Sequence, residues 1–190
     1  MATVAGAVLA AGSGVRMGTP KGELVVGGMR LVDRAVAALR DGGCDPVLAV
    51  VRGGVVVPDS RAVVNPDPDR GMRSSLALAV EAAGDADALA VLLADVPGQG
   101  AAAVRAVLSG WQTGRIAVAR YADGSRGHPI VMPVPLWRHA LASAGPDAGA
   151  RALLADRADL IDEVDAPGDP ADLDTPADLA AWARRAAGPS

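Results

Sequence analysis

The amino-acid sequence predicts a three-layer α/β/α domain built on a mostly parallel, mixed β-sheet. Short runs that are apolar throughout alternate with segments in which apolar residues recur at helical spacing. Continuous apolar runs are typical of strands that are covered by helices on both faces, as in a parallel sheet. No interior stretch of the 190 residues resembles a linker, so we expect residues 1–190 to form a single domain.

The predicted elements alternate along the chain. Residues 88–93 form the most apolar segment and are expected to be the central strand, whereas 160–164 are expected at an edge. The predicted strands are 4–9, 23–26, 47–51, 62–64, 88–93, 116–119, 130–132 and 160–164. The predicted helices are about 29–42, a helix that follows 71–76 and runs to about 83, then 101–108, 135–144, 149–155 and one from 176. The last helix has a full start signal, with Thr175 as N-cap, Pro176 at the first helical position and Asp178 at the third.

The composition limits the class of protein and its partners. A formal charge of −4 and a pI near 5.1 argue against non-specific binding to nucleic acid. The single cysteine, Cys44, excludes an internal disulfide, fits a reducing compartment and is interpreted as a small buried residue. No apolar run reaches transmembrane length and the N-terminus has no basic region, so we expect a cytoplasmic protein without a membrane partner.

A glycine-rich loop follows the first predicted strand. Small residues occupy positions 10–14, and consecutive N–H groups in such a turn form a concave site for an anion. Arg16 and Lys21 add two positive charges beside it, the first as a planar fork and the second as a mobile point charge. The loop therefore predicts binding of a nucleoside triphosphate, through Leu9, Ala10, Ala11, Gly12, Ser13, Gly14, Arg16 and Lys21.

Other interpretations of this loop compete with the triphosphate site. No window has the G-x-x-x-x-G-K-[ST] spacing of a mononucleotide P-loop. The glycines are close to a dinucleotide fingerprint, for which Arg52 would suit a 2′-phosphate. However, Pro20 and the glycines at 22, 27 and 28 leave no helix where that motif needs one. A plain glycine-rich surface turn would leave the two cations unexplained.

Asp95 is the second residue after the predicted central strand. The carboxyl ends of parallel strands meet at one edge of a sheet, so its carboxylate is expected beside the glycine-rich loop. Mg²⁺ is held by few protein carboxylates together with phosphate oxygens and water, so one well-placed aspartate is enough to begin a site. The competing interpretation is a turn aspartate that precedes a proline.

Four other polar residues have both a structural and a functional interpretation. Asn65, Ser74 and Ser75 lie between a strand and a helix, where Asn and Ser form turns and helix caps but where ligands also bind. We expect Asn65 to contribute to the nucleotide site. His128 lies between a glycine and a proline and is interpreted either as a hydrogen-bonded structural residue or as a contact to a substrate.

These motifs resemble a known family. The signature loop of the nucleotidyltransferases that act on molybdopterin is similar to the stretch Leu9-Ala10-Ala11-Gly12-x-x-x-Arg16-Met17-Gly18-x-x-Lys21. More broadly, the stretch resembles the nucleotide-diphospho-sugar transferase fold. Later motifs extend the resemblance over nearly the whole chain, namely Gly71-Met72-x-Ser74-Ser75-Leu76, Asp95-x-Pro97, Gly127-His128-Pro129 and Asp172-x-Asp174-Thr175-Pro176.

The resemblance implies roles for the matching residues. Asp95 would bind Mg²⁺, with Asp174 as a second metal ligand. Ser75 would lie against the base and ribose of the nucleotide, whereas Ser74 and His128 would contact the acceptor. The 71–76 segment resembles the cytidylyltransferase members, and Ala11 stands where guanylyltransferase members usually carry a second glycine, so CTP is favoured.

The sequence thus predicts a Mg²⁺-dependent enzyme that transfers a nucleotidyl group from an NTP to a phosphorylated acceptor and releases pyrophosphate. The acceptor phosphate is already an anion, so the catalytic residues Arg16, Lys21 and Asp95 have to position the reactants and neutralise charge. The resemblance implies the pterin phosphate of the molybdenum cofactor as acceptor, and a molybdoenzyme or its chaperone as protein partner. The alternatives are a molybdopterin guanylyltransferase, a nucleotidyltransferase for another phosphorylated metabolite, an NAD(P)-dependent oxidoreductase and a non-catalytic nucleotide sensor.

Overall fold

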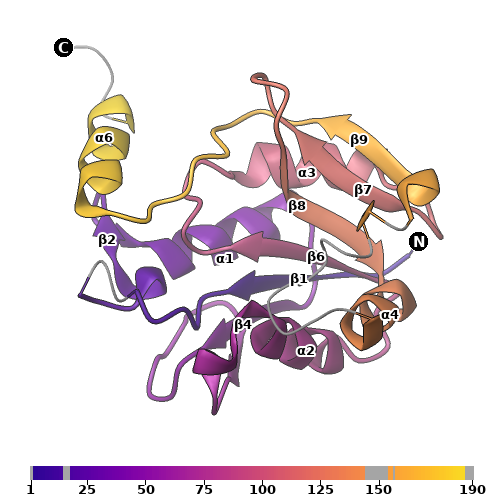
Figure 1. Ribbon diagram of the computed structural model, residues 1–190, viewed down its shortest axis with the longest axis horizontal. Helices are drawn as coiled ribbons and strands as arrows, with labels where there is room; N and C mark the ends of the chain where they lie inside the picture. Colours follow the sequence, from indigo (N-terminus) through magenta and orange to yellow (C-terminus); the bar gives the residue numbers. More distant parts are fainter. Residues whose placement is uncertain (1, 15–17, 144–153, 156, 187–190) are drawn as a thin grey trace.

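The computed structural model describes residues 2–14, 18–143, 154–155 and 157–186. Seven strands form one sheet in the order β5-β4-β1-β6-β8-β7-β9 (Figure 1). Every neighbouring pair is parallel except the two that contain β8. The sheet is therefore mixed and mostly parallel, as predicted, with β6 in its centre. The strands are β1 (Val4–Leu9), β4 (Val47–Val51), β5 (Arg61–Val64), β6 (Ala88–Leu93), β7 (Ile116–Arg120), β8 (Arg126–Pro133) and β9 (Ile161–Asp165).

Helices cover both faces of the sheet and complete the three predicted layers (Figure 1). Helices α1 and α3 pack on one face, and α2 and α4 on the other. In β6, Ala90 and Leu92 belong to the first core, whereas Leu89 and Val91 belong to the second. Alternate residues of a strand face opposite sides, so a strand that is covered twice is apolar throughout. The four helices are α1 (Leu31–Gly42), α2 (Met72–Ala82), α3 (Ala101–Gly110) and α4 (Val134–Ser143).

The segment before α1 differs from its prediction. The extended piece expected at 23–26 is a 3-10 helix, η2 (Lys21–Glu23), followed by the two-residue strand β2 (Val25–Val26). β2 pairs with β3 (Met29–Arg30) in a hairpin whose turn residues Gly27 and Gly28 have φ of 59° and 79°. Two successive positive φ angles are what a tight hairpin turn requires. Helix α1 therefore begins two residues later than predicted, after the hairpin.

Most other bounds agree with the structure to within one or two residues. The largest difference is β8, which begins at Arg126 rather than 130, because it pairs with β7 on both sides of a register shift. Two short 3-10 helices, η3 (Pro68–Arg70) and η4 (Ala158–Leu160), were not predicted. The helix predicted over 149–155 falls mostly outside the described residues. Within the described ranges, no helix has the length and apolar character needed to cross a membrane.

The C-terminal helix α6 (Pro176–Ala186) lies beside β2 and is not part of the two helix layers that cover the sheet (Figure 1). Its cap is as predicted. Thr175 Oγ1 accepts the N–H of Asp178 at 3.2 Å, and the Asp178 carboxylate accepts the N–H of Thr175 at 2.8 Å. The Arg34 guanidinium of α1 lies 5.3 Å from the ring centroid of Trp182, a cation–π contact. A small apolar cluster completes the contact and consists of Leu24, Val26, Leu31, Leu173, Leu179 and Trp182.

Candidate active site

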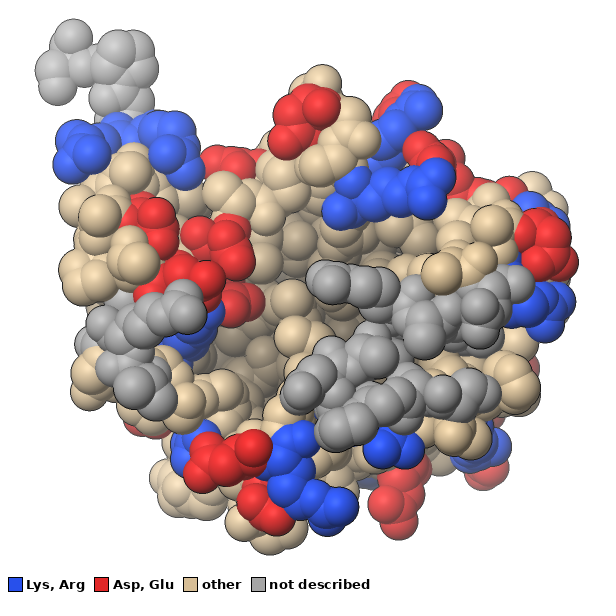
Figure 2. Space-filling model, viewed as in Figure 1, with Lys and Arg blue, Asp and Glu red and all other residues tan. Residues whose placement is uncertain are grey.

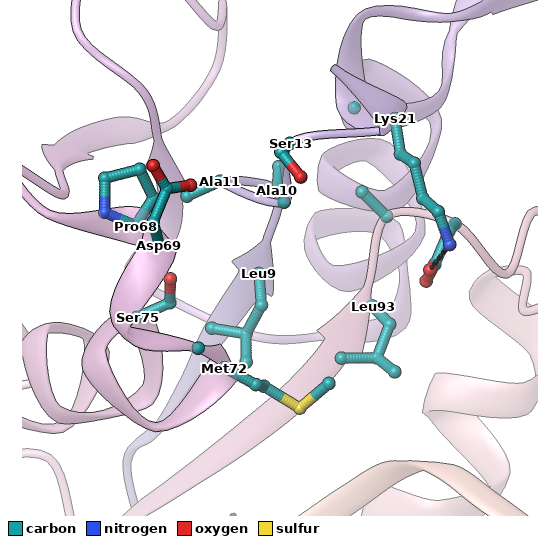
Figure 3. Close-up of a pocket in the computed structure, with 15 residues that line it drawn as sticks. Leu9, Ala10, Ala11, Ser13, Lys21, Pro68, Asp69, Met72, Ser75 and Leu93 are labelled. Carbon is teal, nitrogen blue, oxygen red and sulfur yellow. Dashed lines mark hydrogen bonds and ion pairs between the residues drawn. The ribbon is translucent and has the colours of Figure 1, made fainter. Parts of the chain in front are cut away.

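A pocket of about 370 Å³ lies at the carboxyl ends of β1 and β6. The chain passes from β1 to β4 on one side and later to β6 on the other, so the strand order reverses here, where ligands bind in open α/β sheets. Figure 3 shows Lys21 on one side of the pocket and Asp69 and Ser75 on the opposite side, with Leu9 between them. The volume is within the range of small-molecule sites. Of the predicted site residues, those that line the pocket are Leu9, Ala10, Ala11, Gly12, Ser13, Lys21, Ser75 and Asp95.

Of the other predicted residues, the structure describes five, and none of these five lines the pocket. Asn65, Ser74, His128 and Asp174 do not line the pocket, although the first two adjoin Ser75 and the last binds Lys21. Arg16 lies outside the described residues. The sixth, Gly14, is needed by the loop itself: its φ is 59°, and a Cβ there would lie 2.0 Å from the carbonyl oxygen of residue 19. The glycine thus allows residue 14 to lie directly against the backbone of residue 19.

Lys21 joins two carboxylates that are distant in the sequence. Its Nζ donates to Asp95 Oδ2 at 2.9 Å and also to Asp174 Oδ1. The side chains of Lys21 and Asp95 are 22% and 23% exposed, so this ion pair is largely shielded from water. Burial acts to lower the pKa of Lys21, but the hydrogen bonds to Asp174 and Asp95 outweigh it and the pKa lies above its ordinary value. In Figure 2, acidic side chains gather next to α6 at one side of a hollow on this face.

Contacts between two loops bring the C-terminal segment to the end of β6. The N–H of Leu173 donates to the Asp95 carbonyl at 2.8 Å, and the N–H of Asp169 donates to the Gly98 carbonyl at 3.3 Å. A Cβ on Gly98 would lie 2.4 Å from the Asp169 carbonyl oxygen, and one on Gly168 would lie 2.4 Å from the Gly98 carbonyl oxygen. Gly98 and Gly168 therefore permit the two loops to approach closely. This approach places Asp174 against Lys21.

Gly98→Ala should lower the melting temperature by several degrees. The added methyl group meets backbone, and overpacking of this kind costs about 1–3 kcal/mol, with each kcal/mol worth roughly 2–4 °C in a chain of this size. Gly53→Ala is the matched control, because a Cβ there meets nothing within 4 Å. Thermal unfolding followed by circular dichroism measures both variants. An unchanged melting temperature for Gly98→Ala would contradict the close crossing of the two loops.

Asn65 holds the two serines at the start of α2. It is 3% exposed, and its Nδ2 donates to the hydroxyl oxygens of Ser74 and Ser75 at 2.9 Å each. Its Oδ1 accepts the N–H of Asp67 at 3.0 Å, the turn expected of asparagine. The helix-cap interpretation of the serines is wrong, since the N-cap residue is Gly71 and no side chain caps the helix. Ser75 is instead directed to the pocket by its buried neighbour.

Arg52 is a site residue that the sequence analysis considered only for a dinucleotide. Its Nε donates to the Ala11 carbonyl at 2.9 Å, and its Nη2 donates to Asp69 Oδ1 at 2.9 Å. Ala11 and Asp69 both line the pocket, so the guanidinium ties the glycine-rich loop to η3. Arg52 directly follows β4, and the rule that ligands bind at strand ends would have pointed to it.

His128 is held against the central strand. Its Nδ1 lies 3.0 Å from the Val91 carbonyl oxygen, which can only accept, so Nδ1 carries the proton. Burial lowers the pKa of His128, although the bond to Val91 and the charge of Asp95 oppose this. The imidazole is therefore neutral at pH 7. The Tyr121 hydroxyl donates to the backbone carbonyl of His128, and burial raises the pKa of this tyrosine to about 12.

The carboxylates near Lys21 fit a divalent cation that arrives with a nucleotide. Among the described residues there is no group of three or more His, Cys, Asp or Glu that could hold a metal ion by itself. Asp95 and Asp174 both contact Lys21 Nζ, so both reach a cation at that position. Mg²⁺ at nucleotide sites takes one or two carboxylates, with phosphates and water as its other ligands. The two aspartates match the protein's share of such a site.

The chain is similar to proteins that have been named in other organisms. Curated relatives include nicotine blue oxidoreductase of Paenarthrobacter nicotinovorans, which is 34% identical over 176 residues that cover 85% of this chain and 86% of that protein. A protein of Opitutus terrae named probable molybdenum cofactor guanylyltransferase is 36% identical over 148 residues, with 74% and 70% of the two chains covered.

A solved structure and a family model complete the comparison. A nucleotidyl transferase from Methanothermobacter thermautotroptrophicus superposes with a TM-score of 0.78 over 96% of this chain and 97% of that one. At 20% identity this likeness shows the fold, which is the nucleotide-diphospho-sugar transferase fold expected from the sequence. The MobA-like NTP transferase domain model matches residues 6–163. The chain therefore belongs to the MobA-like NTP transferase family.

Proposed function

We propose that the protein transfers CMP from CTP to the phosphate of a pterin-type acceptor, the molybdenum cofactor, and releases pyrophosphate. One observation carries this proposal: a lysine ammonium and two aspartates meet beside a pocket at the strand ends of β1 and β6. That pocket is lined by the glycine-rich loop, whose consecutive N–H groups suit phosphate oxygens. The combination favours a triphosphate with a divalent cation over an uncharged ligand.

The reaction needs positioning and charge neutralisation rather than a protein nucleophile. An oxygen of the acceptor phosphate forms a bond to the α-phosphorus of CTP, and the bond from that phosphorus to the bridging oxygen of the β-phosphate breaks. Lys21, with Arg16 as predicted from the sequence, neutralises the β- and γ-phosphates that leave as pyrophosphate. Asp95 and Asp174 would hold Mg²⁺, and the bound ion supplies further positive charge to the phosphates.

The side of the pocket opposite Lys21 suits the nucleoside. Ala11 and Met72 provide apolar surface there, Leu9 adds apolar surface between that side and Lys21, and Ser75 provides a hydroxyl that Asn65 holds in place. We assign CTP to this pocket because Ala11 and the 71–76 segment resemble the cytidylyl members.

His128 and Ser74 remain our proposed contacts to the acceptor. A molybdoenzyme or its chaperone, in the cytoplasm, is the protein partner that this function implies.

CTP with Mg²⁺ should raise the melting temperature more than GTP or ATP with Mg²⁺. A ligand at about 100 times its Kd stabilises the folded state by about 2.7 kcal/mol, which corresponds to a shift of several degrees. Differential scanning fluorimetry of each nucleotide, with Mg²⁺ and with EDTA, measures this. A larger shift with GTP would assign the protein to the guanylyl branch, and no shift with any NTP would contradict the proposed function.

An NAD(P)H-dependent oxidoreductase is the second candidate, because the relative at 34% identity is named nicotine blue oxidoreductase. The site gives this candidate less support. The loop leads into the three-residue helix η2 instead of the longer helix on which a dinucleotide pyrophosphate rests. Arg52 is the residue suited to a 2′-phosphate, but its guanidinium already donates hydrogen bonds to the Ala11 carbonyl and to Asp69. Stabilisation by NADPH that persists in EDTA would favour the oxidoreductase.

A further inference from the structure

Lys21 is the only lysine in the chain, and the remaining 17 of its 18 Lys and Arg residues are arginines. Its Nζ lies between the carboxylates of Asp95 and Asp174 and contacts both. An ammonium is a compact point charge on a flexible stem, whereas a guanidinium is a planar fork that pairs in fixed geometry. The chain's single lysine therefore lies where a small cation on a flexible stem contacts two carboxylates.

The ammonium and a divalent ion compete for the same place. A Mg²⁺ ion bound to both carboxylates would have to sit within about 2.1 Å of their oxygens, next to the present position of Nζ. Two cations that close repel strongly in a partly buried site, so the lysine has to leave before the metal enters. Nucleotide phosphates offer it a new partner, since Lys21 lines the same pocket as Gly12 and Ser13 of the loop.

We propose that Lys21 is a placeholder for the divalent cation: it occupies the position between Asp95 and Asp174 in the nucleotide-free protein and moves to the phosphates when a metal–nucleotide complex binds. Metal alone then binds weakly, and metal and nucleotide strengthen each other's binding, a coupling that is reciprocal by thermodynamic necessity. The inference rests on the proposed function only in the identity of the anion that receives Lys21. The competition with metal needs no nucleotide.

Mn²⁺ binding without nucleotide tests the competition directly. Electron paramagnetic resonance of free Mn²⁺ gives the affinity of the wild type and of variants whose fold is checked by circular dichroism. Lys21→Gln, which removes the charge, should bind Mn²⁺ about tenfold more tightly or better, whereas Lys21→Arg should stay as weak as the wild type. The double variant Lys21→Gln with Asp95→Asn should lose the gain, which locates the ion. Equal Mn²⁺ affinity in wild type and Lys21→Gln would overturn the proposal.

A matched control separates this effect from the change in net charge. Arg115→Gln removes one positive charge from the pair with Asp162, whose atoms Nε and Oδ2 are 2.5 Å apart at the opposite edge of the sheet. Its Mn²⁺ affinity should equal that of the wild type. A gain in Arg115→Gln equal to that in Lys21→Gln would mean that net charge alone governs metal binding, and the placeholder would be rejected.

The single lysine also provides its own reporter. Protein labelled with [ε-¹³C]lysine gives one side-chain resonance, which should stay in place when Mg²⁺ is added and shift when CTP is then added. A shift with Mg²⁺ alone, or none with bound CTP and Mg²⁺, would contradict the transfer of Lys21. The two proposals fail separately: no NTP binding in fluorimetry removes the proposed function, whereas nucleotide binding without a Mn²⁺ gain in Lys21→Gln removes only the placeholder.

Discussion

Asp95→Asn is expected to reduce pyrophosphate release by about three orders of magnitude while the protein still folds. The substitution keeps the shape and a hydrogen-bonding oxygen but removes the charge that would hold a divalent cation beside the phosphates. Metal stabilisation of transferring phosphate supplies several kcal/mol, and about 4 kcal/mol corresponds to a thousandfold in rate. Since the Asp95 side chain is 23% exposed and only its pairing with Lys21 changes, the free energy of unfolding should change little.

A coupled pyrophosphate assay on wild type and variant measures this effect, with CTP, Mg²⁺ and the pterin acceptor present. Asp162→Asn is the matched control, because it removes a carboxylate from the pair with Arg115 at the opposite edge of the sheet. Its rate should equal that of the wild type. Equal rates in Asp95→Asn and wild type would exclude Asp95 from the mechanism and, with it, the assignment of the metal to the end of β6.

Lys21→Ala should lower kcat/KM by about two orders of magnitude and weaken NTP binding. Removal of one group that stabilises developing charge in a shielded site typically costs about 10²–10³ in rate. The fold should persist, because the rest of the loop and η2 keep their backbone contacts.

Steady-state kinetics and calorimetric titration with CTP measure both parts of this prediction. Arg115→Ala, at the opposite edge of the sheet, serves as the control for loss of a paired cation and should retain wild-type kinetics. If Lys21→Ala bound and turned over CTP as the wild type does, the lysine would have no part in the reaction. Loss of activity with an unfolded variant is excluded by circular dichroism on the same sample.

The strands and helices could be predicted because neighbouring residues determine them. The apolar run of β6 predicts a strand that is buried on both faces, and Thr175 with Asp178 predicts the start of α6. The prediction was wrong where a local pattern had two meanings. Residues 23–26 were predicted as an extended piece and residue 29 as the helix start, but residues 25–30 form a hairpin, because two glycines with positive φ make its turn. Ser74 and Ser75 were considered as caps, yet they lie in the first turn of α2 and Gly71 occupies the cap position.

The sequence by itself determined which residue types lie at the strand ends: glycines after β1 and an aspartate after β6, which the strand-end rule places at one edge of the sheet. Only the tertiary structure decided which of them meet. Asp95 has no basic neighbour in the sequence, and its partner Lys21 is 74 residues away, while Asp174 is 153 residues from the same lysine. These contacts depend on the order of strands and on two loops that cross at Gly98. No window of sequence encodes such distant pairings, because they are set by the packing of the whole sheet rather than by neighbouring residues.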